Sequence, residues 1–218
     1  MRILIVVATF QEISPLLAYF GQLEKNRLSA FKTKANNELE VLITGVGMVA
    51  TAYQMGNQLA TKKYDLIINA GIAGSFKSKY PIGTTIQVLQ EYFSELGAES
   101  PKGFIPIDGM GMNETNRVLS TNAFPIQHLH TLPKGIGITV NKVHGITDSI
   151  VEVETQFDAD IESMEGGAAM FVSKMEKVNF IEIRTISNRV EPRNKANWNI
   201  ALAITNLNKT LIAITNEI

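Results

Sequence analysis

The sequence predicts an α/β fold in which helices cover a largely parallel central sheet. Short, almost fully apolar runs rich in β-branched residues recur along the chain, as expected of strands buried on both faces. Segments with a helical spacing of apolar residues lie between these runs, and such alternation is typical of a parallel sheet. The length of 218 residues fits a single domain, residues 1–218, because one core can still grow up to about 250 to 300 residues.

The first half of the chain contains three strand signals, and the first two are each followed by a helix signal. The predicted elements are a strand over residues 2–8, a helix over 11–23 with Pro15 tolerable in its first turn, a strand over 40–45, a helix over 50–61 and a strand over 65–70. The third strand is expected to end in a glycine turn over residues 71–74.

The second half is punctuated by glycine and proline and is harder to assign. Strands are predicted over residues 83–88, 135–140 and 179–186, and helices over 161–174 and 196–216, with Trp198 near the start of the last helix as a packing anchor. Residues 97–133 give no secure pattern, and this segment could form a loop-built wall of a pocket.

Composition excludes several classes of function. The chain is 45% hydrophobic and 19% charged with a net charge of −1, so it lacks the basic surface that nucleic-acid binding requires. It has no cysteine, which excludes disulfides, thiolate nucleophiles and zinc–sulfur sites, and the three histidines, His128, His130 and His144, are expected to be structural or at the surface rather than metal ligands. No run reaches the ~18 apolar residues that span a membrane, so a cytoplasmic location away from membranes is expected.

Candidate functional residues gather where strands should end, which is where ligands bind in open α/β sheets. These are Glu12, the glycines at 45 and 47, the glycines at 71 and 74, and the run 163–167 (SMEGG). Each signal has a structural alternative, because Glu12 could stabilise a helix N-terminus and the glycines could serve turns or close packing. Neither glycine pair completes GxGxxG, so a nicotinamide site is not expected.

Taken as a set, five motifs resemble the nucleoside phosphorylase and nucleosidase superfamily. They are A-x-x-x-E at 8–12, GVGMVATA at 45–52, NAGIAGSF at 69–76, SMEGGAA at 163–169 and RTISN at 184–188. The runs 187–194 (SNRVEPRN), 198–199 (WN), 96–99 (LGAE) and 103–106 (GFIP) look most like the futalosine hydrolases within it. The resemblance implies a three-layer α/β/α domain with a mixed, mostly parallel central sheet, no cofactor, no metal and a nucleoside as the small-molecule substrate.

The resemblance also implies roles for individual residues. Glu12 matches the carboxylate that positions and deprotonates the attacking water, and Met164 and Glu165 match the pair that contacts the ribose. Ala8, Val46 and Gly74 stand where the family brings small groups near the sugar and base.

Asn188 replaces an aspartate of the methylthioadenosine nucleosidases, and its amide can hydrogen-bond a 6-oxopurine but cannot donate a proton outright. Three cations, Arg189, Arg193 and Lys142, are candidates for the carboxylate of futalosine.

Alternatives remain open at this stage. The arginines that bind phosphate in the phosphorylases are missing from residues 68–71 and 9–12, which favours hydrolysis. A methylthioadenosine, S-adenosylhomocysteine or aminofutalosine nucleosidase is one alternative, and a catalytically silent nucleoside-binding protein is another. By resemblance a homodimer or higher homo-oligomer is expected, and Phe104 could reach a neighbour's pocket or its own core.

Overall fold

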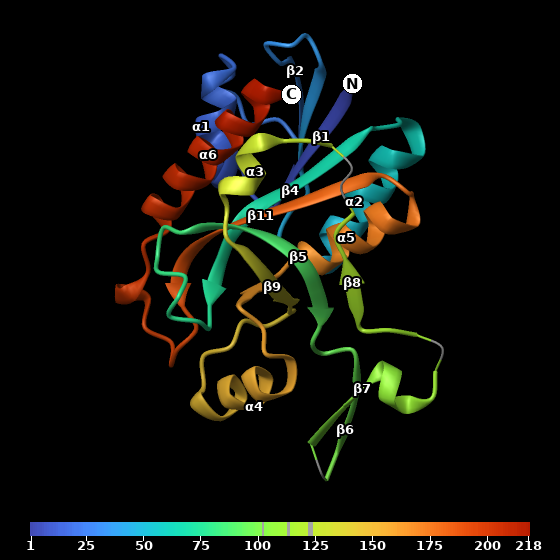
Figure 1. Ribbon diagram of the computed structural model, residues 1–218, viewed down its shortest axis with the longest axis vertical. Coiled ribbons are helices and arrows are strands. Elements are labelled where there is room, and N and C mark those ends of the chain that lie inside the picture. The colour runs from blue at the N-terminus through green and yellow to red at the C-terminus, as the bar shows by residue number, and fades with distance from the viewer. Residues whose placement is uncertain (102, 113, 122–123) are drawn as a thin grey trace.

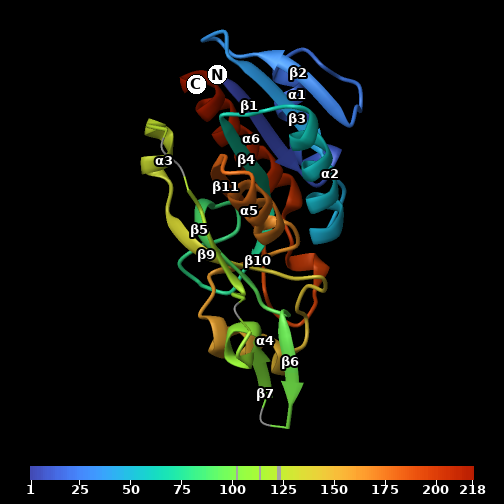
Figure 2. The same ribbon diagram turned by 90° about the vertical axis from the view of Figure 1, so that its right-hand side faces the viewer.

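A central sheet with helices on both faces forms the body of the molecule (Figures 1 and 2). The computed structural model describes residues 1–101, 103–112, 114–121 and 124–218. Its strands are β1 Arg2–Val7, β2 Leu28–Lys32, β3 Glu38–Ile43, β4 Leu66–Ser75, β5 Thr85–Phe93, β6 Gly97–Ser100, β7 Gly103–Pro106, β8 Arg117–Leu119, β9 Lys134–Thr139, β10 Ile161–Ser163 and β11 Asn179–Arg189. Its helices are α1 Phe10–Tyr19, α2 Met48–Thr61, α3 Gln127–Thr131, α4 Thr147–Phe157, α5 Gly166–Met175 and α6 Ile200–Glu217, with 3-10 turns at Ile107–Met110 and Lys195–Asn197.

The sheet is mixed and mostly parallel. Within the described ranges its strand order is β10-β9-β5-β11-β4-β1-β3-β2, and β8 pairs with β5. Strand β1 is parallel to both of its neighbours, β3 and β4, and the pairs β4–β11, β5–β9 and β9–β10 are also parallel. The antiparallel pairs are β2–β3, β5–β11, β5–β8 and β4–β10. This arrangement confirms the predicted α/β class. Because β10 pairs with both β9 and β4, the strands β4, β11, β5, β9 and β10 also close into a barrel, which the sequence pattern did not predict.

Two helical layers bury the alternating faces of the central strands. Ile3, Ile5 and Val7 of β1 pack in one core with α1 and α6, while Leu4 and Val6 pack in a second core with α2 and α5. Side chains of a strand point alternately to opposite faces, so a strand covered on both faces must be apolar throughout. Burial of each such side chain contributes roughly 1.5–3 kcal/mol, which explains the unbroken apolar run of β1.

The predicted glycine turn over residues 71–74 is wrong, because β4 continues through it to Ser75. Neither Gly71 nor Gly74 has a positive φ, so they do not serve a turn. A Cβ on Gly71 would collide with the Arg184 guanidinium, and a Cβ on Gly74 would lie 2.9 Å from Val190 Cγ2. These glycines therefore make room for side chains of β11 inside a continuous strand.

Three other predicted boundaries are corrected. The predicted helix 161–174 is a strand, β10, followed by α5, because residues 161–163 pair with β9 and β4. Helix α1 ends at Tyr19 instead of residue 23, since Gly21 adopts a φ of 81° and stops it. Helix α6 begins at Ile200 instead of residue 196, with the Asn199 side chain accepting a hydrogen bond from Leu202 N–H, so Trp198 precedes the helix.

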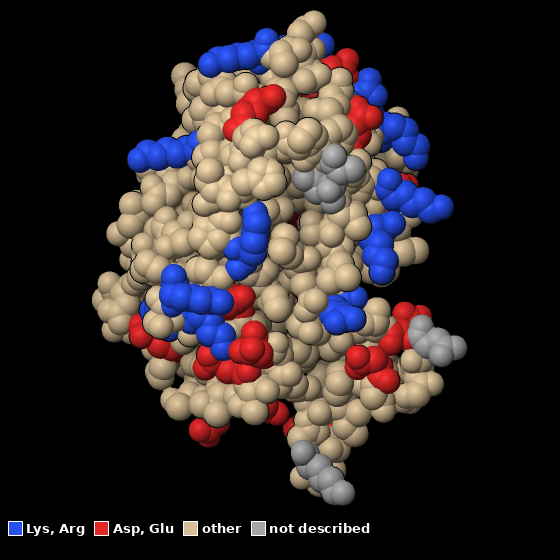
Figure 3. Space-filling model, in the orientation of Figure 1, with Lys and Arg blue, Asp and Glu red and all other residues tan. Residues whose placement is uncertain are grey.

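The unassigned segment 97–133 contains the β6–β7 hairpin, β8 and α3. The hairpin lies at the same end of the molecule as α4, whereas α3 packs against α6 toward the opposite end (Figure 1). Phe104 of this hairpin lies 6.5 Å from Phe157 of α4, measured between ring centroids. Acidic and basic side chains are interspersed over the face seen in Figure 3. Within the described residues, no helix is long and apolar enough to cross a membrane.

Candidate active site

One cavity of about 550 Å³ opens at the carboxyl ends of β1, β4, β10 and β11. The glycine turn after β3 contributes to its wall through Val46. Nine residues singled out from the sequence all line this cavity: Glu12, Asn188, Glu165, Met164, Gly74, Ala8, Val46, Arg189 and Arg193. The structure therefore brings together side chains that are up to 185 positions apart in the chain, between Ala8 and Arg193. No group of three or more metal-ligating side chains occurs in the described part of the chain.

Glu12 is buried at the start of α1 and is held by three hydrogen bonds. Its Oε2 accepts from Thr9 N–H at 3.0 Å and Thr9 Oγ1 at 2.8 Å, which completes a capping box, and its Oε1 accepts from Ile72 N–H at 3.1 Å. Burial raises the pKa of Glu12, while the bonds from Thr9 and Ile72 lower it. The carboxylate thus caps its helix and also lines the cavity, in a fixed orientation suited to accepting a proton.

Glu165 stands between β10 and α5, and the glycine turn after β3 holds it. Its Oε1 accepts a hydrogen bond from Gly47 N–H at 2.9 Å, and its Oε2 lies 3.8 Å from Arg184 Nη1. Gly47 has a φ of 95°, a conformation that favours glycine, so the GVG motif serves to deliver this N–H. The arrangement fixes an anionic acceptor in the cavity wall beside Met164.

Asn188 lies at a register shift in β11, directly across from Gly74 of β4. Its Nδ2 donates to the backbone oxygen of Arg189 at 2.8 Å, and its Oδ1 accepts from Ser187 Oγ at 2.8 Å. A carbonyl oxygen can only accept, so the Arg189 contact fixes which end of the amide is nitrogen. The second N–H of Nδ2 is therefore left to donate to a ligand.

The three cation candidates occupy different places. Arg189 donates from Nη2 to Phe76 O at 2.8 Å, and its buried Nη1 has no hydrogen-bond partner among the described residues. The guanidinium of Arg193 lies 5.2 Å from the ring centroid of Trp198, which itself lines the cavity. Lys142 is exposed and is not among the residues that line this cavity. The interpretation of Trp198 as only a packing anchor therefore has to be extended, because its ring forms part of the wall.

Among the cavity residues that were not predicted from the sequence to be functional are Glu162 and His144. Glu162 of β10 is buried, and its Oε2 lies 2.7 Å from Nδ1 of His144, which also lines the cavity. The expectation that His144 is merely structural or at the surface is thus incomplete. Glu162 stands in an acidic stretch, DADIESME at 158–165, so its local sequence gave no signal that this carboxylate is buried.

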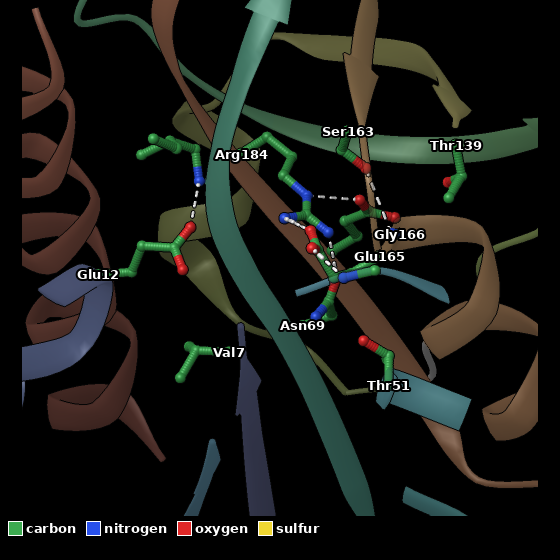
Figure 4. A network of polar contacts seen from close by, with 12 residues as sticks. Val7, Glu12, Thr51, Asn69, Thr139, Ser163, Glu165, Gly166 and Arg184 are labelled. Atoms are coloured by element: carbon green, nitrogen blue, oxygen red, sulfur yellow. Dashed lines mark hydrogen bonds and ion pairs between the residues drawn. The ribbon is translucent and has the colours of Figure 1, made fainter. Parts of the chain in front are cut away.

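Below the cavity, a buried polar network centres on Arg184 of β11 (Figure 4). Its Nε donates to Glu182 Oε1 at 2.7 Å, and its Nη2 donates to Asn69 Oδ1. Through Nη1 it approaches Glu165, and a Cβ built on Gly71 would lie close to both Arg184 Nη1 and Glu12 Oε1. One buried cation therefore orients and stabilises the carboxylates of the cavity wall.

Glu91 of β5 joins the same network as a second buried carboxyl beside Glu182. Burial raises the pKa of Glu91 well above its usual 4.5, and the negative charge of Glu182 raises it further. Burial also raises the pKa of Glu182, but Arg184 opposes that rise. These effects favour the protonated form of Glu91 and, through Arg184, the ionised form of Glu182. Thr139 Oγ1 donates to Glu91 Oε2 at 2.8 Å, while Glu91 Oε1 and Glu182 Oε2 have no hydrogen-bond partner among the described residues.

Glu91→Gln is expected to leave the stability at neutral pH unchanged or higher and to flatten its dependence on pH. The unfolded chain loses the Glu91 proton above about pH 4.5 while the folded chain keeps it, so wild-type stability falls as pH rises from there. Glutamine keeps the donor and the acceptor and removes this titration. Urea unfolding at pH 5 and pH 8 measures the difference, with the exposed Glu99→Gln as a control expected to match the wild type. A variant whose stability still fell with pH as steeply as that of the wild type would contradict the protonated state of Glu91.

Comparisons with known proteins agree with the sequence resemblance. The model of the phosphorylase superfamily matches residues 2–216. Futalosine hydrolase of Acidothermus cellulolyticus is 29% identical over 182 residues, covering 80% of this chain and 74% of that relative. Futalosine hydrolase of Streptomyces coelicolor is 26% identical over 177 residues, covering 76% of this chain and 73% of that relative.

Solved structures give the same fold. A 5′-methylthioadenosine/S-adenosylhomocysteine nucleosidase from Helicobacter pylori superposes with a TM-score of 0.85 at 18% identity, covering 100% of this chain and 99% of that one. Futalosine hydrolase of Helicobacter pylori superposes with a TM-score of 0.84 at 18% identity, covering 100% and 98%.

Proposed function

The chain belongs to the phosphorylase superfamily, and on that premise we propose that it is a hydrolase that cleaves the N-glycosidic bond of futalosine. The products are hypoxanthine and dehypoxanthine futalosine, which places the reaction in the alternative menaquinone pathway. The named relatives support this substrate, and the cavity offers an acceptor for water, an acceptor for ribose hydroxyls and a donor for the base.

The orientation of the Asn188 amide carries the choice of base. Its free N–H can donate to a ligand acceptor, and the 6-oxygen of hypoxanthine is such an acceptor. The 6-amino group of adenine would set a donor against this donor and leave a polar pair unmatched, at a cost of about 1–3 kcal/mol. A 6-oxopurine nucleoside is therefore favoured over methylthioadenosine.

Hydrolysis proceeds with the carboxylates in separate roles. The C1′–N9 bond breaks, its electron pair leaves with the purine, and positive charge develops on the ribose. Glu12 accepts the proton of the water that attacks C1′ and stabilises the developing cation. Glu165 accepts hydrogen bonds from the ribose hydroxyls, with Met164 packing beside the sugar, while Ala8, Val46 and Gly74 leave room for the sugar and base.

Phosphate is not expected to replace water as the nucleophile. The carboxylate of Glu12 occupies the cavity wall, where it would repel a dianion. Arg184 is buried and is already paired with Glu182, Asn69 and Glu165, so its charge is not available to bind phosphate.

The remaining features of the substrate suggest where its far end lies. The carboxylate of futalosine requires a cation. Arg193, which lies on the Trp198 ring, lines the cavity, and so does Arg189, whose buried Nη1 has no partner among the described residues. A homodimer or higher homo-oligomer and a cytoplasmic location stay predictions, and measuring the mass in solution tests the former.

The nature of the nucleophile is tested by the products. In phosphate-free buffer made with ¹⁸O-water, futalosine should yield free hypoxanthine and a sugar product with ¹⁸O at C1′. Added phosphate should not raise the rate. A reaction that needs phosphate and releases a sugar 1-phosphate would contradict the hydrolase assignment.

A further inference from the structure

The proposed reaction lacks one component, an acid for the departing base. Purine leaving groups depart more readily when protonated, and general acid catalysis of this kind contributes typically 10²- to 10⁴-fold. Asn188 hydrogen-bonds the base but has no proton to give. Another group at the same cavity must therefore supply the proton, or the base must leave as an anion.

The other carboxyl groups of the cavity are committed elsewhere. Glu12 and Glu165 serve water and ribose in the proposed reaction, and both are held as acceptors by backbone N–H groups. Glu191 accepts a hydrogen bond from Asn197 Nδ2 at 2.6 Å. Glu162 accepts hydrogen bonds from the backbone N–H of His144 to both oxygens, each at 3.2 Å, so it too is held as an acceptor.

His144 is the remaining group that can exchange a proton near neutral pH. Its Nδ1 lies 2.7 Å from Glu162 Oε2, so the carboxylate fixes the orientation of the ring. Phe76 packs against the ring at 6.5 Å between centroids. Among the described residues Nε2 has no hydrogen-bond partner, which leaves this atom for a ligand.

The sheet register brings this pair beside Asn188. Gly74 of β4 is the partner of Glu162 in β10 and of Asn188 in β11, so the two side chains flank the same glycine. A Cβ built on Gly74 would lie 3.2 Å from Asn188 Nδ2 and 3.5 Å from Glu162 Cγ. A base hydrogen-bonded to Asn188 is therefore next to the His144–Glu162 pair.

We propose that His144, held by Glu162, is a catalytic residue that donates a proton to the departing purine. As the C1′–N9 bond breaks and its electron pair moves to the base, the proton on His144 Nε2 passes to a ring nitrogen of the purine. Water supplies the group that bonds C1′, and Glu12 takes the proton of that water. Proton exchange with solvent then returns Glu12 and His144 to their starting states, so the inference rests on the proposed hydrolysis.

Other charges also face this histidine. In the main cavity they include Arg189, Glu191 and Arg193 of the segment around the end of β11. On its other side His144 lines a second cavity, between the β6–β7 hairpin and α4, together with Glu95, Glu99 and Glu152. Lys142 lies exposed on the same loop as His144. Glu162 is the one that contacts the ring directly, which makes it the partner to vary.

The test compares futalosine hydrolysis by the wild type, His144→Gln and the exposed His130→Gln across pH 5 to 9. The wild-type kcat should fall on the alkaline side, where the donor loses its proton. His144→Gln should lower kcat by about 100-fold or more with a much smaller change in KM, and should lose the alkaline fall. His130→Gln should behave as the wild type.

Glu162→Gln keeps the imidazole and removes the carboxylate that orients it, so kcat should fall while KM changes much less. This variant also tests the role of His144 if His144→Gln does not fold. The proposal would be overturned by an unimpaired His144→Gln, by an alkaline fall that persists in it, by a wild type without any alkaline fall, or by a Glu162→Gln variant with the wild-type kcat. Failure of the wild type to release hypoxanthine would instead overturn the proposed function itself.

Discussion

Glu12→Gln is expected to lower the rate of hypoxanthine release from futalosine by about 100- to 10,000-fold. Glutamine is close to glutamate in shape, and its single oxygen can still accept from either Thr9 or Ile72, but it cannot take up the proton of the attacking water. The loss should appear in kcat more than in KM, because binding of the base and ribose relies on other residues. Steady-state assays by chromatography of the free base measure both constants.

The acid side of the pH profile provides an independent check on Glu12. Burial raises the pKa of Glu12 above its usual 4.5, and the reaction needs the ionised form, so wild-type kcat/KM should fall as pH decreases through a midpoint above 4.5. The exposed Glu24→Gln variant, which alters a glutamate outside the cavity, should keep the wild-type rate and profile. Full activity of Glu12→Gln would remove Glu12 from the mechanism.

Asn188→Asp should shift the preference from 6-oxopurine toward 6-aminopurine nucleosides. The aspartate replaces the free N–H by an acceptor, which faces the 6-oxygen of hypoxanthine with no donor between them but can accept from the 6-amino group of adenine. One unmatched polar pair costs about 1–3 kcal/mol, so the ratio of kcat/KM for futalosine over methylthioadenosine should fall by about 5- to 150-fold.

The ratio, not either rate alone, is the informative quantity for Asn188. Loss of packing or of fold would lower both rates together and leave the ratio near its wild-type value. Asn57→Asp on the exposed face of α2 makes the same chemical change away from the cavity and should leave the ratio unchanged. An unaltered ratio in Asn188→Asp would mean that this residue does not contact the base.

The parts of the fold that were predicted from the sequence are those fixed by local pattern. The unbroken apolar run of β1 and the helical spacing after it correctly predicted a buried strand followed by α1. Because Glu12 follows that strand directly, its place at the carboxyl edge of the sheet followed from the pattern.

Elements fixed by distant contacts were not predicted. The three residues of β10 are a strand only because β9 and β4 lie on either side, and the local sequence resembles the start of a helix. That error hid Glu162, whose partner His144 lies 18 positions earlier and meets it only in the folded chain. Likewise, Gly71 and Gly74 have the composition of a turn, and only the side chains of Arg184 and Asn188 over them explain a strand.

Arg184 illustrates a signal that was present but not interpreted. It stands in the middle of a strand whose central residues are all buried. A fully buried arginine requires buried partners of opposite charge. Glu182 two positions earlier lies on the same face, as the strand periodicity of two residues indicates. The remaining partners, Glu165 and Asn69, come from other elements and could not be paired with it from sequence alone.

The central claim is that this cavity hydrolyses a 6-oxopurine nucleoside, and one assay tests it most directly. Purified protein is incubated in phosphate-free buffer with futalosine and, separately, with methylthioadenosine, and the free bases are quantified by chromatography. We expect rapid release of hypoxanthine from futalosine and little adenine from methylthioadenosine. Preferential release of adenine would contradict the role assigned to Asn188, and release of neither base would contradict the proposed hydrolysis.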